Sequence, residues 1–248
     1  MDEFTDKVVL ITGAGHGLGR ELALAFASMG LSVAANDINP LNLDETVSQV
    51  IHMGGKARSY VFDIAKRMPI EGMLAQVLEH FGRLDVLINH AAVRPDASLL
   101  EMDEWDFHRT LDVNLGGPFF TMQLAGRIMQ QAGAGSIVNL VSTPNPGQFK
   151  HGFSAFSASA AGLLGLTQSA AKELAAHHVR LNAACCGPNC LGKFTSANLD
   201  IEGLHEWSSS HPQLRVGEHA ELDRLVLFLC SPEASSVTGQ IFTYSFSQ

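Results

Sequence analysis

Residues 12–19 of the chain read Thr-Gly-Ala-Gly-His-Gly-Leu-Gly, and this glycine-rich stretch is the most informative part of the sequence. It follows a short run rich in β-branched residues, Lys7–Thr12, and precedes a segment with helical spacing of its apolar residues, Arg20–Ser28. Glycine lets a backbone turn tightly and approach a pyrophosphate, whose charge the N-terminus of the next helix stabilises. Because strand, glycine turn and helix follow one another here, the stretch predicts a dinucleotide-binding loop.

An acidic residue supports this interpretation. Asp37 ends the second apolar run, eighteen residues after Gly19. A carboxylate at that place can bond both hydroxyls of an adenosine ribose and repels a 2′-phosphate. No arginine occupies the loop or directly follows Asp37, so the sequence favours NAD over NADP. The alternative is a plain glycine-rich turn beside a surface aspartate.

Outward from the loop, short apolar runs alternate with helix-like segments, which is typical of an α/β domain with a parallel sheet covered on both faces. Further strands are expected at residues 31–36, 57–62, 84–89, 136–141, 179–184 and 240–244, and helices near 41–53, 69–81, 103–131, 153–176 and 218–230. We find no linker or repeat and therefore expect a single domain over residues 1–248. The irregular stretch at about 191–215 breaks the alternation and is predicted to form a lid over a site.

Composition excludes several classes of protein. The 248 residues are 46% hydrophobic and 17% charged, with a formal charge of −9, which argues against disorder and against nucleic-acid binding. The acidic start lacks the features of a secretory signal, and the long uncharged stretches are interrupted by Pro, Gly and polar residues, so no membrane span is expected. The four cysteines show no disulfide-framework spacing, which favours a reducing cytoplasm.

Several motifs in order make the chain resemble the short-chain dehydrogenase/reductase family over nearly its whole length. They are Thr12–Gly19, Phe62-Asp63-Ile64, the Leu87–Ala92 segment with Asn89 and Ala91, Leu111–Gly116 with Asn114, Ser136–Ser142, Val179–Gly187 and Val237–Gln240. The resemblance implies a single Rossmann-type doubly wound parallel sheet with helices on both faces, binding NAD(H) at the carboxyl ends of the strands.

The resemblance also assigns roles to residues. It implies that Asn114 and Ser142 are catalytic, and that the cofactor is bound by Gly13, His16, Gly17, Leu18, Gly19, Asp37, Asp63, Ile64, Asn89, Ala91 and Gly187. Among these, the Asp63 segment is the one that contacts adenine in the family. Members of the family are commonly oligomers, and here the only formal charge between Arg127 and Lys172 is Lys150, which suits a helix buried in a dimer or tetramer interface.

One family feature is absent from the sequence. Family members carry Tyr-x-x-x-Lys about a dozen residues past the catalytic serine, where this chain has Phe156 and Ala160. The only tyrosines, Tyr60 and Tyr244, lie in other predicted strands. Loss of an acid–base group typically costs 10²–10⁴-fold in rate, so activity would be reduced but not necessarily abolished.

Candidates to supply the missing proton are His90 and the loop residues Lys150 and His151, which with Phe156 are expected to border the substrate pocket. The alternative is that His90 only packs and that the loop residues are solvated. The spacing of Cys185, Cys186 and Cys190 with His205 and His211 does not match a metal site, so none is expected.

Two functions remain open from the sequence. The first is an atypical NAD(H)-dependent oxidoreductase acting on a small apolar alcohol or ketone, with Asn114 and Ser142 orienting the substrate and His90 or a water handling the proton. The second is a catalytically inactive NAD(H)-binding protein that acts as a sensor or as a partner subunit.

Overall fold

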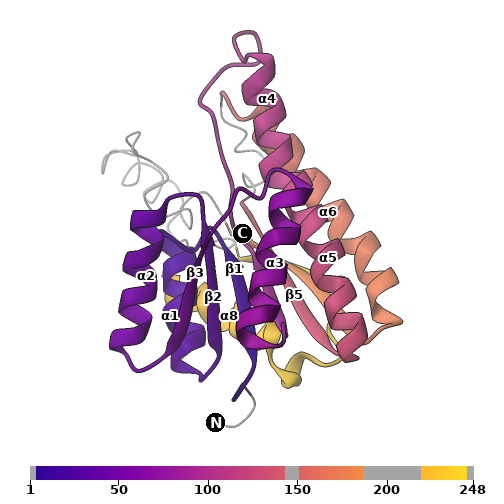
Figure 1. Cartoon of the computed structure of the whole chain (residues 1–248). Coiled ribbons are helices and arrows are strands. Elements are labelled where there is room, and N and C mark those ends of the chain that lie inside the picture. The colour runs from indigo at the N-terminus through magenta and orange to yellow at the C-terminus, as the bar shows by residue number, and fades with distance from the viewer. Residues whose placement is uncertain (1–3, 143–150, 187–218, 245–248) are drawn as a thin grey trace, which may run out of the picture.

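The computed structural model describes residues 4–142, 151–186 and 219–244, shown in colour in Figure 1. Its strands are β1 (Val8–Thr12), β2 (Ser32–Asp37), β3 (Lys56–Val61), β4 (Val86–Asn89), β5 (Gly135–Ser142), β6 (Val179–Cys186) and β7 (Ile241–Tyr244). Its α-helices are α1 (Gly17–Ser28), α2 (Pro40–His52), α3 (Arg67–Phe81), α4 (Glu104–Leu111), α5 (Gly117–Ala132), α6 (Ser154–Ala175) and α8 (His219–Cys230).

The strands form one seven-stranded sheet in the order β3-β2-β1-β4-β5-β6-β7, and each neighbouring pair is parallel. The chain builds outward from β1 to β3, then returns to place β4 on the other side of β1. The loops after β1 and β4 therefore leave the sheet in opposite directions and open a crevice at the carboxyl edge. The predicted doubly wound sheet is confirmed.

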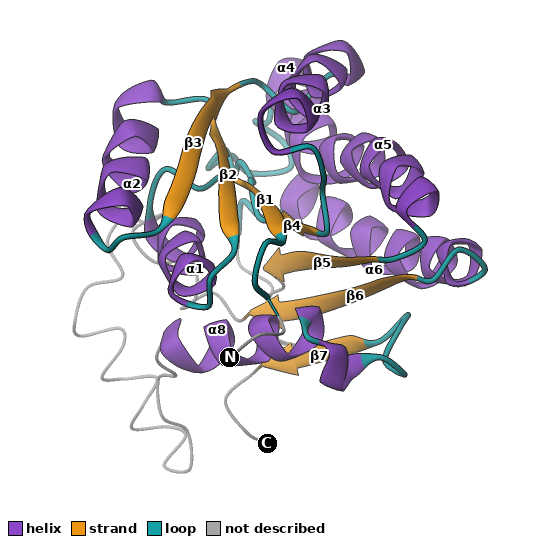
Figure 2. Cartoon of the chain, turned by 60° about the horizontal axis from the view of Figure 1, so that its bottom comes forward, coloured by secondary structure: helices purple, strands orange, loops and turns teal. Residues whose placement is uncertain are grey.

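Successive residues of β1 supply two separate cores. Val9 and Ile11 belong to a cluster with buried side chains of α1, α2 and α8, whereas Val8 and Leu10 belong to a cluster with α3, α5 and α6. Figure 2 shows these two groups of helices on opposite sides of the sheet. Because strand residues alternate in direction and both faces are covered, β1 is apolar at every position from Val8 to Ile11.

The helix expected over residues 103–131 is interrupted. A five-residue π-helical segment, η1 (Asp112–Gly116), separates α4 from α5 and contains Asn114. Pro118 has no N–H to donate to the carbonyl of Asn114, four residues earlier, so a regular helix cannot continue through this point. Wide turns of this kind occur frequently at functional sites.

Part of the sequence prediction falls outside the described residues. Lys150, Gly187 and the proposed lid at 191–215 belong to the stretches that the structure does not describe. Within the described ranges, no helix is long and apolar enough to cross a membrane.

Candidate functional site

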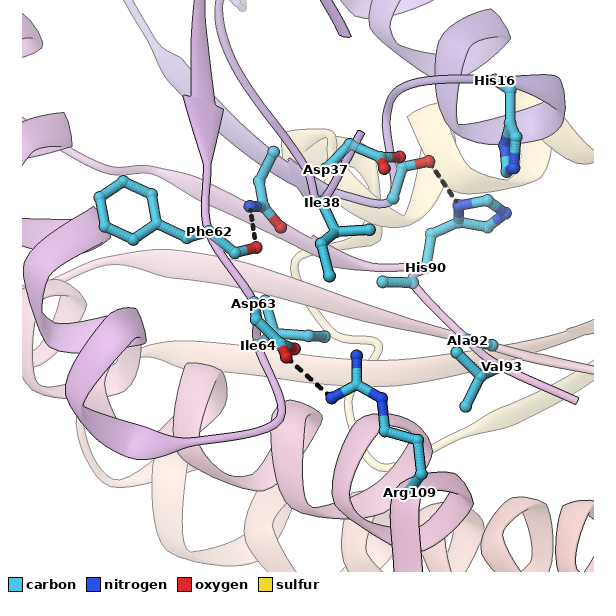
Figure 3. Close-up of a pocket in the computed structure, with 13 residues that line it drawn as sticks. His16, Asp37, Ile38, Phe62, Asp63, Ile64, His90, Ala92, Val93 and Arg109 are labelled. Carbon is cyan, nitrogen blue, oxygen red and sulfur yellow. Dashed lines mark hydrogen bonds and ion pairs between the residues drawn. The ribbon is translucent and has the colours of Figure 1, made fainter. Parts of the chain in front are cut away.

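Two cavities lie at the carboxyl edge of the sheet and share Ala91 and Ala92. The larger one, of about 140 Å³, is bordered by the glycine loop and by the ends of β2, β3 and β4 (Figure 3). Its lining is Gly13, His16, Asn36, Asp37, Ile38, Phe62, Asp63, Ile64, His90, Ala91, Ala92, Val93 and Arg109. The smaller one, of about 30 Å³, lies beside Ser142 and Phe156.

The glycine loop is packed too tightly for side chains at two positions. Gly13 has φ +70°, and a Cβ placed there would lie 2.8 Å from the Cα of Ala91. A Cβ on Gly19 would overlap the carbonyl oxygen of Gly13. The loop can therefore approach β4 and α1 closely only because both residues are glycine. Such a cradle fits a pyrophosphate at the start of a helix.

The rest of the loop is hydrogen-bonded to side chains of α1 and α2. The Thr46 hydroxyl donates to the carbonyl of Ala14 at 2.9 Å, and Arg20 donates to the carbonyl of Gly15 at 2.6 Å. Of the other predicted loop residues, Leu18 is buried in the α1 core, Gly17 has φ +51°, and His16 is exposed at the mouth of the larger cavity.

Asp37 is fixed at the end of β2. Its Oδ2 accepts the amide N–H of Gly15 at 2.9 Å, and its Oδ1 accepts the amide N–H of Asn39 at 3.0 Å. Each carboxylate oxygen has a further lone pair, so the group can still accept hydrogen bonds from a ligand in the cavity. The structure thus joins Asp37 to the loop that precedes it by some twenty residues.

Asp63 and Ile64 line the same cavity, at the end of β3. Asp63 forms an ion pair with Arg109 of α4, with 2.8 Å between Oδ2 and Nη1, and its Oδ1 accepts the amide N–H of Ala65. Burial acts to raise the pKa of Asp63, but its hydrogen bonds and the charge of Arg109 outweigh this and hold the pKa below the usual value. The carboxylate is therefore kept ionised. Arg109 was not predicted from the sequence, because no motif near it in α4 indicates a binding residue.

His90 lies against the glycine loop, and Figure 3 shows its ring beside Asp37 and His16. Its Nδ1 is 3.2 Å from the carbonyl oxygen of Gly13, and its amide N–H donates to the hydroxyl of Thr12. Burial lowers the pKa of His90 from 6.5 to about 4, so the ring is neutral at physiological pH. It lines the larger cavity and is not among the residues that line the smaller one beside Ser142.

Asn89 belongs to a buried polar network under the site. Its Nδ2 donates to Oδ1 of Asn139 on β5, its Oδ1 accepts from Thr121 of α5, and Asn139 donates to Thr167 of α6. The network joins both central strands to the two helices that cover them. Sequence reasoning missed Asn139, although a polar residue inside the apolar run of β5 was a usable signal.

Asn114 also uses its side chain within the protein. Its Oδ1 accepts the amide N–H of Val93 at 2.8 Å, and its Nδ2 donates to the carbonyl of Val93 and to Oγ of Ser159. It therefore fixes the backbone that follows β4, at the wall shared by the two cavities. The carbonyl of Asn114 lies in the π-helical segment described above.

The smaller cavity brings together the residues that the sequence assigned to chemistry. Ser142 at the end of β5 and Asn114 line it together with Phe156 and Ala160, which are 6% and 7% exposed on the first turns of α6. Its other lining residues are Asn89, Ala91, Ala92, Pro118, Leu140, Val141, Ser159 and Leu163. Of these described residues, none carries an acid or a base that titrates near neutrality.

The remaining sequence candidates lie elsewhere. His151 is exposed and lines a separate hollow of about 370 Å³ with Leu99, Leu100 and Phe153. Lys150 and Gly187 are outside the described residues. Within the described part of the chain, the structure contains no group of three or more potential metal ligands, and Cys185 is buried.

Comparison with known proteins identifies relatives along nearly the whole chain. Residues 13–245 match the family model described as enoyl-(acyl carrier protein) reductase. The chain is 37% identical over 239 residues to the 3-oxoacyl-(acyl-carrier-protein) reductase FabG of Thermotoga maritima, covering 95% of this chain and 94% of that protein. It is 36% identical over 239 residues to the short chain dehydrogenase/reductase astE of Aspergillus oryzae, covering 94% and 91%.

The fold has a solved counterpart. An NAD⁺-bound xylitol dehydrogenase matches with a TM-score of 0.87 and 28% sequence identity, covering 99% of this chain and 100% of that one.

Proposed function

Because this chain belongs to the short-chain dehydrogenase/reductase family, we propose that it is an NAD(H)-dependent oxidoreductase acting on a small, apolar alcohol or ketone. The relatives named above are reductases and dehydrogenases, which supports oxidoreductase chemistry. The name of the Thermotoga relative, a 3-oxoacyl-(acyl-carrier-protein) reductase, adds 3-oxoacyl thioesters to the ketones worth testing.

The observation that carries the cofactor proposal is the position of Asp37. Its carboxylate is held at the larger cavity by the amide of Gly15, within the loop expected to bind the pyrophosphate. A fixed negative charge there favours the free ribose hydroxyls of NAD and disfavours the 2′-phosphate of NADP. The cradle formed by Gly13 and Gly19 supports the same assignment.

In this proposal the larger cavity holds the adenosine half of the cofactor, and the smaller cavity holds the reacting substrate. NAD(H), when bound, supplies or accepts the hydride. Ser142 donates a hydrogen bond to the substrate oxygen, and Asn114 keeps the Val93 backbone in place between the two cavities. Phe156 and Ala160 make the reacting end apolar, because neither side chain carries a hydrogen-bonding group.

The proton must then come from a group other than a tyrosine. His90 is a poor candidate, because it is neutral and contacts the glycine loop rather than the substrate cavity. We therefore assign proton delivery to a water hydrogen-bonded to Ser142. Without a positioned acid, turnover is expected to fall short of an acid-assisted site by roughly 10²–10⁴-fold.

A second function is favoured by the smaller cavity itself. Its described lining residues include no acid or base that titrates near neutrality. The cavity itself has a volume of only about 30 Å³. These properties suit a protein that binds NAD(H) without turning over a substrate and that serves as a sensor or as the partner of an active relative.

One experiment separates the two functions. NADH binding is measured by fluorescence titration, and the wild type and a Phe156→Tyr/Ala160→Lys double mutant are assayed against alcohols, ketones and 3-oxoacyl thioesters. The enzyme proposal expects slow turnover by the wild type and faster turnover by the double mutant. Activity in the double mutant alone would favour the binding protein, and absence of NADH binding by the wild type would exclude both.

A groove between α5 and α6 is relevant to the oligomeric state. It has a volume of about 300 Å³ and includes Phe119, which is 41% exposed. One side of the groove is formed by α6, the helix that the sequence predicts to be buried in a subunit interface, and we propose a homodimer or homotetramer on that basis. The cytoplasmic location stays a prediction from the sequence.

A further inference from the structure

Arg94 is a half-buried cation close to the wall that the two cavities share. It follows Val93, whose backbone N–H and carbonyl are both hydrogen-bonded to the side chain of Asn114. The backbone that leads into residue 94 is therefore fixed. Within residues 4–142, 151–186 and 219–244, Arg94 forms neither an ion pair nor a hydrogen bond. Among these residues its five N–H donors are unused.

An aromatic ring sets the position of the Arg94 guanidinium. The guanidinium lies over the ring of Phe153, with 4.6 Å between its Cζ atom and the ring centroid, which is cation–π geometry. Phe153 in turn packs edge-to-face against Phe156, with 6.0 Å between the two centroids. Phe156 lines the smaller cavity together with Ser142. Two aromatic rings thus separate the positive charge from the expected reacting end of the site.

The smaller cavity is too small for a whole substrate. Its volume of about 30 Å³ holds little more than a reacting group, since one water molecule already needs roughly 10–15 Å³ of such space. A larger space adjoins Phe153, namely the hollow of about 370 Å³ that Leu99 and Leu100 also line. Ser157 faces this hollow, and its buried Oγ atom has no hydrogen-bond partner within the described residues. An unpaired buried hydroxyl is costly, so Ser157 indicates a place that a ligand completes.

We propose that the substrate carries a carboxylate several bonds away from its reacting carbonyl or alcohol carbon, and that Arg94 binds this carboxylate. The apolar chain between the two groups lies along Phe153 in the hollow. A guanidinium matches a planar carboxylate and can donate two parallel hydrogen bonds to it. The inference rests on the proposed oxidoreductase function and deepens it, because the reacting end stays apolar and the far end becomes anionic. Hydride transfer needs no contribution from Arg94, which determines specificity only.

One negative charge lies in the same region. Asp96, two residues farther along the loop, is exposed, and its Oδ1 atom would be 3.0 Å from a Cβ placed on Gly152. Asp96 does not form an ion pair with Arg94. Its repulsion of an anion therefore acts through solvent, where salt screens it. Position 96 supplies a matched control, because it lies on the same loop and carries the opposite charge.

The test measures binding to the complex of the protein with NAD⁺, because a ketone and NAD⁺ are both oxidised and cannot react with each other. NADH binding is first confirmed by fluorescence titration. Isothermal titration calorimetry then compares unbranched methyl-ketone acids, from 4-oxopentanoate to 8-oxononanoate, each with its uncharged methyl ester. At the best chain length, the wild type should bind the acid about tenfold more tightly than the ester, as expected for hydrogen bonds to one partly solvated charged group.

Three variants locate the source of this preference. Arg94→Gln removes the charge and keeps a polar side chain, so the ratio of the two dissociation constants should approach one while the affinity for the ester stays unchanged. Arg94→Lys keeps the charge without the planar fork and should retain part of the preference. Asp96→Asn should leave the ratio at its wild-type value or raise it, because it removes a negative charge from the same loop.

Four results would count against these proposals. An equal loss of affinity for acid and ester in Arg94→Gln would overturn the inference, because it indicates that Arg94 only holds Phe153 in place. Failure of the NAD⁺ complex to prefer the acid at any chain length, or to bind either compound, would overturn it too, as would a lowered ratio in Asp96→Asn. Wild type that does not bind NADH would instead refute the proposed function, on which the inference rests.

Discussion

The Nδ1 atom of His90 lies 3.2 Å from the carbonyl oxygen of Gly13, so the residue after β4 is hydrogen-bonded to the residue after β1. The contact spans the point where the strand order reverses, at the floor of the larger cavity. Since a carbonyl accepts, Nδ1 carries the hydrogen in this contact. Burial, reinforced by nearby His16 and opposed by Asp37, leaves the pKa of His90 at about 4.

This relationship predicts how stability depends on pH. Between pH 6.5 and about 4 the unfolded chain protonates His90 while the folded protein does not, so the free energy of unfolding decreases as the pH falls. Over this pH range the protonation of His90 in the unfolded chain should lower the free energy of unfolding by roughly 3 kcal/mol. Urea denaturation of wild type and His90→Asn at pH 7.5 and pH 4.5 measures it. The variant should lose less stability than the wild type, and equal losses would contradict the prediction.

Asp37 should control both affinity and cofactor choice. Asp37→Asn keeps an oxygen for the amide of Gly15 but removes the charge, and NADH affinity should fall about 10–100-fold. Affinity for NADPH should fall less, because the repulsion of the 2′-phosphate is removed as well. Titration of both cofactors checks this, with Asp44→Asn on the exposed face of α2 as the control. Unchanged NADH affinity in Asp37→Asn would exclude Asp37 from the site.

Two glycine substitutions should have opposite effects. Gly19→Ala places a methyl group against the carbonyl of Gly13 and should lower the free energy of unfolding by about 1–3 kcal/mol and weaken NADH binding. Gly165→Ala on α6 meets nothing within 4 Å and should be neutral or stabilising by about 0.5–1 kcal/mol. Denaturation and NADH titration of both variants test the pair. Normal NADH binding by Gly19→Ala would contradict the prediction, because it would show that the loop can move to accommodate the added methyl group.

The network under the site should behave as a unit. Asn139→Ala removes the acceptor for Nδ2 of Asn89 and leaves that buried donor unpaired, which should cost about 1–3 kcal/mol. The double mutant Asn89→Ala/Asn139→Ala should be less destabilised than the sum of its single mutants, because the orphaned partner is gone. Denaturation of all variants gives the coupling energy. As a control, the losses in free energy of unfolding caused by Asn89→Ala and by the remote Gln49→Ala should be additive. Additive losses for the Asn89/Asn139 pair would refute the network.

Much of the architecture could be read from local patterns. The run at 7–12 followed by glycines and the helical spacing at 20–28 predicted β1, the loop and α1, and each later strand lies within two residues of its expected bounds. The break at Asp112–Gly116 was not predicted, because the apolar spacing continues through it. The missing N–H of Pro118 changes only the backbone hydrogen bonds of the helix and leaves the apolar pattern unchanged.

The candidate site was predicted only in part. Residues in recognisable loops, such as Gly13 and Asp37, line the cavity as expected, whereas Arg109 reaches it only because α4 packs beside the end of β3. His90 was predicted to border the substrate, yet it lies against Gly13, since its ring fills the space that Gly19 leaves open.

The order of the elements, the parallel sheet and the glycine loop could be predicted from the sequence, because these depend on apolar periodicity and on residues close along the chain. It also established that phenylalanine and alanine stand at positions 156 and 160. The contacts between residues far apart in the chain became visible only in the folded structure: Asn89 with Asn139, Asn114 with the backbone of Val93, and Asp63 with Arg109. Such contacts depend on how the helices pack against the sheet, and the residues adjacent in sequence do not show which distant partner they will contact.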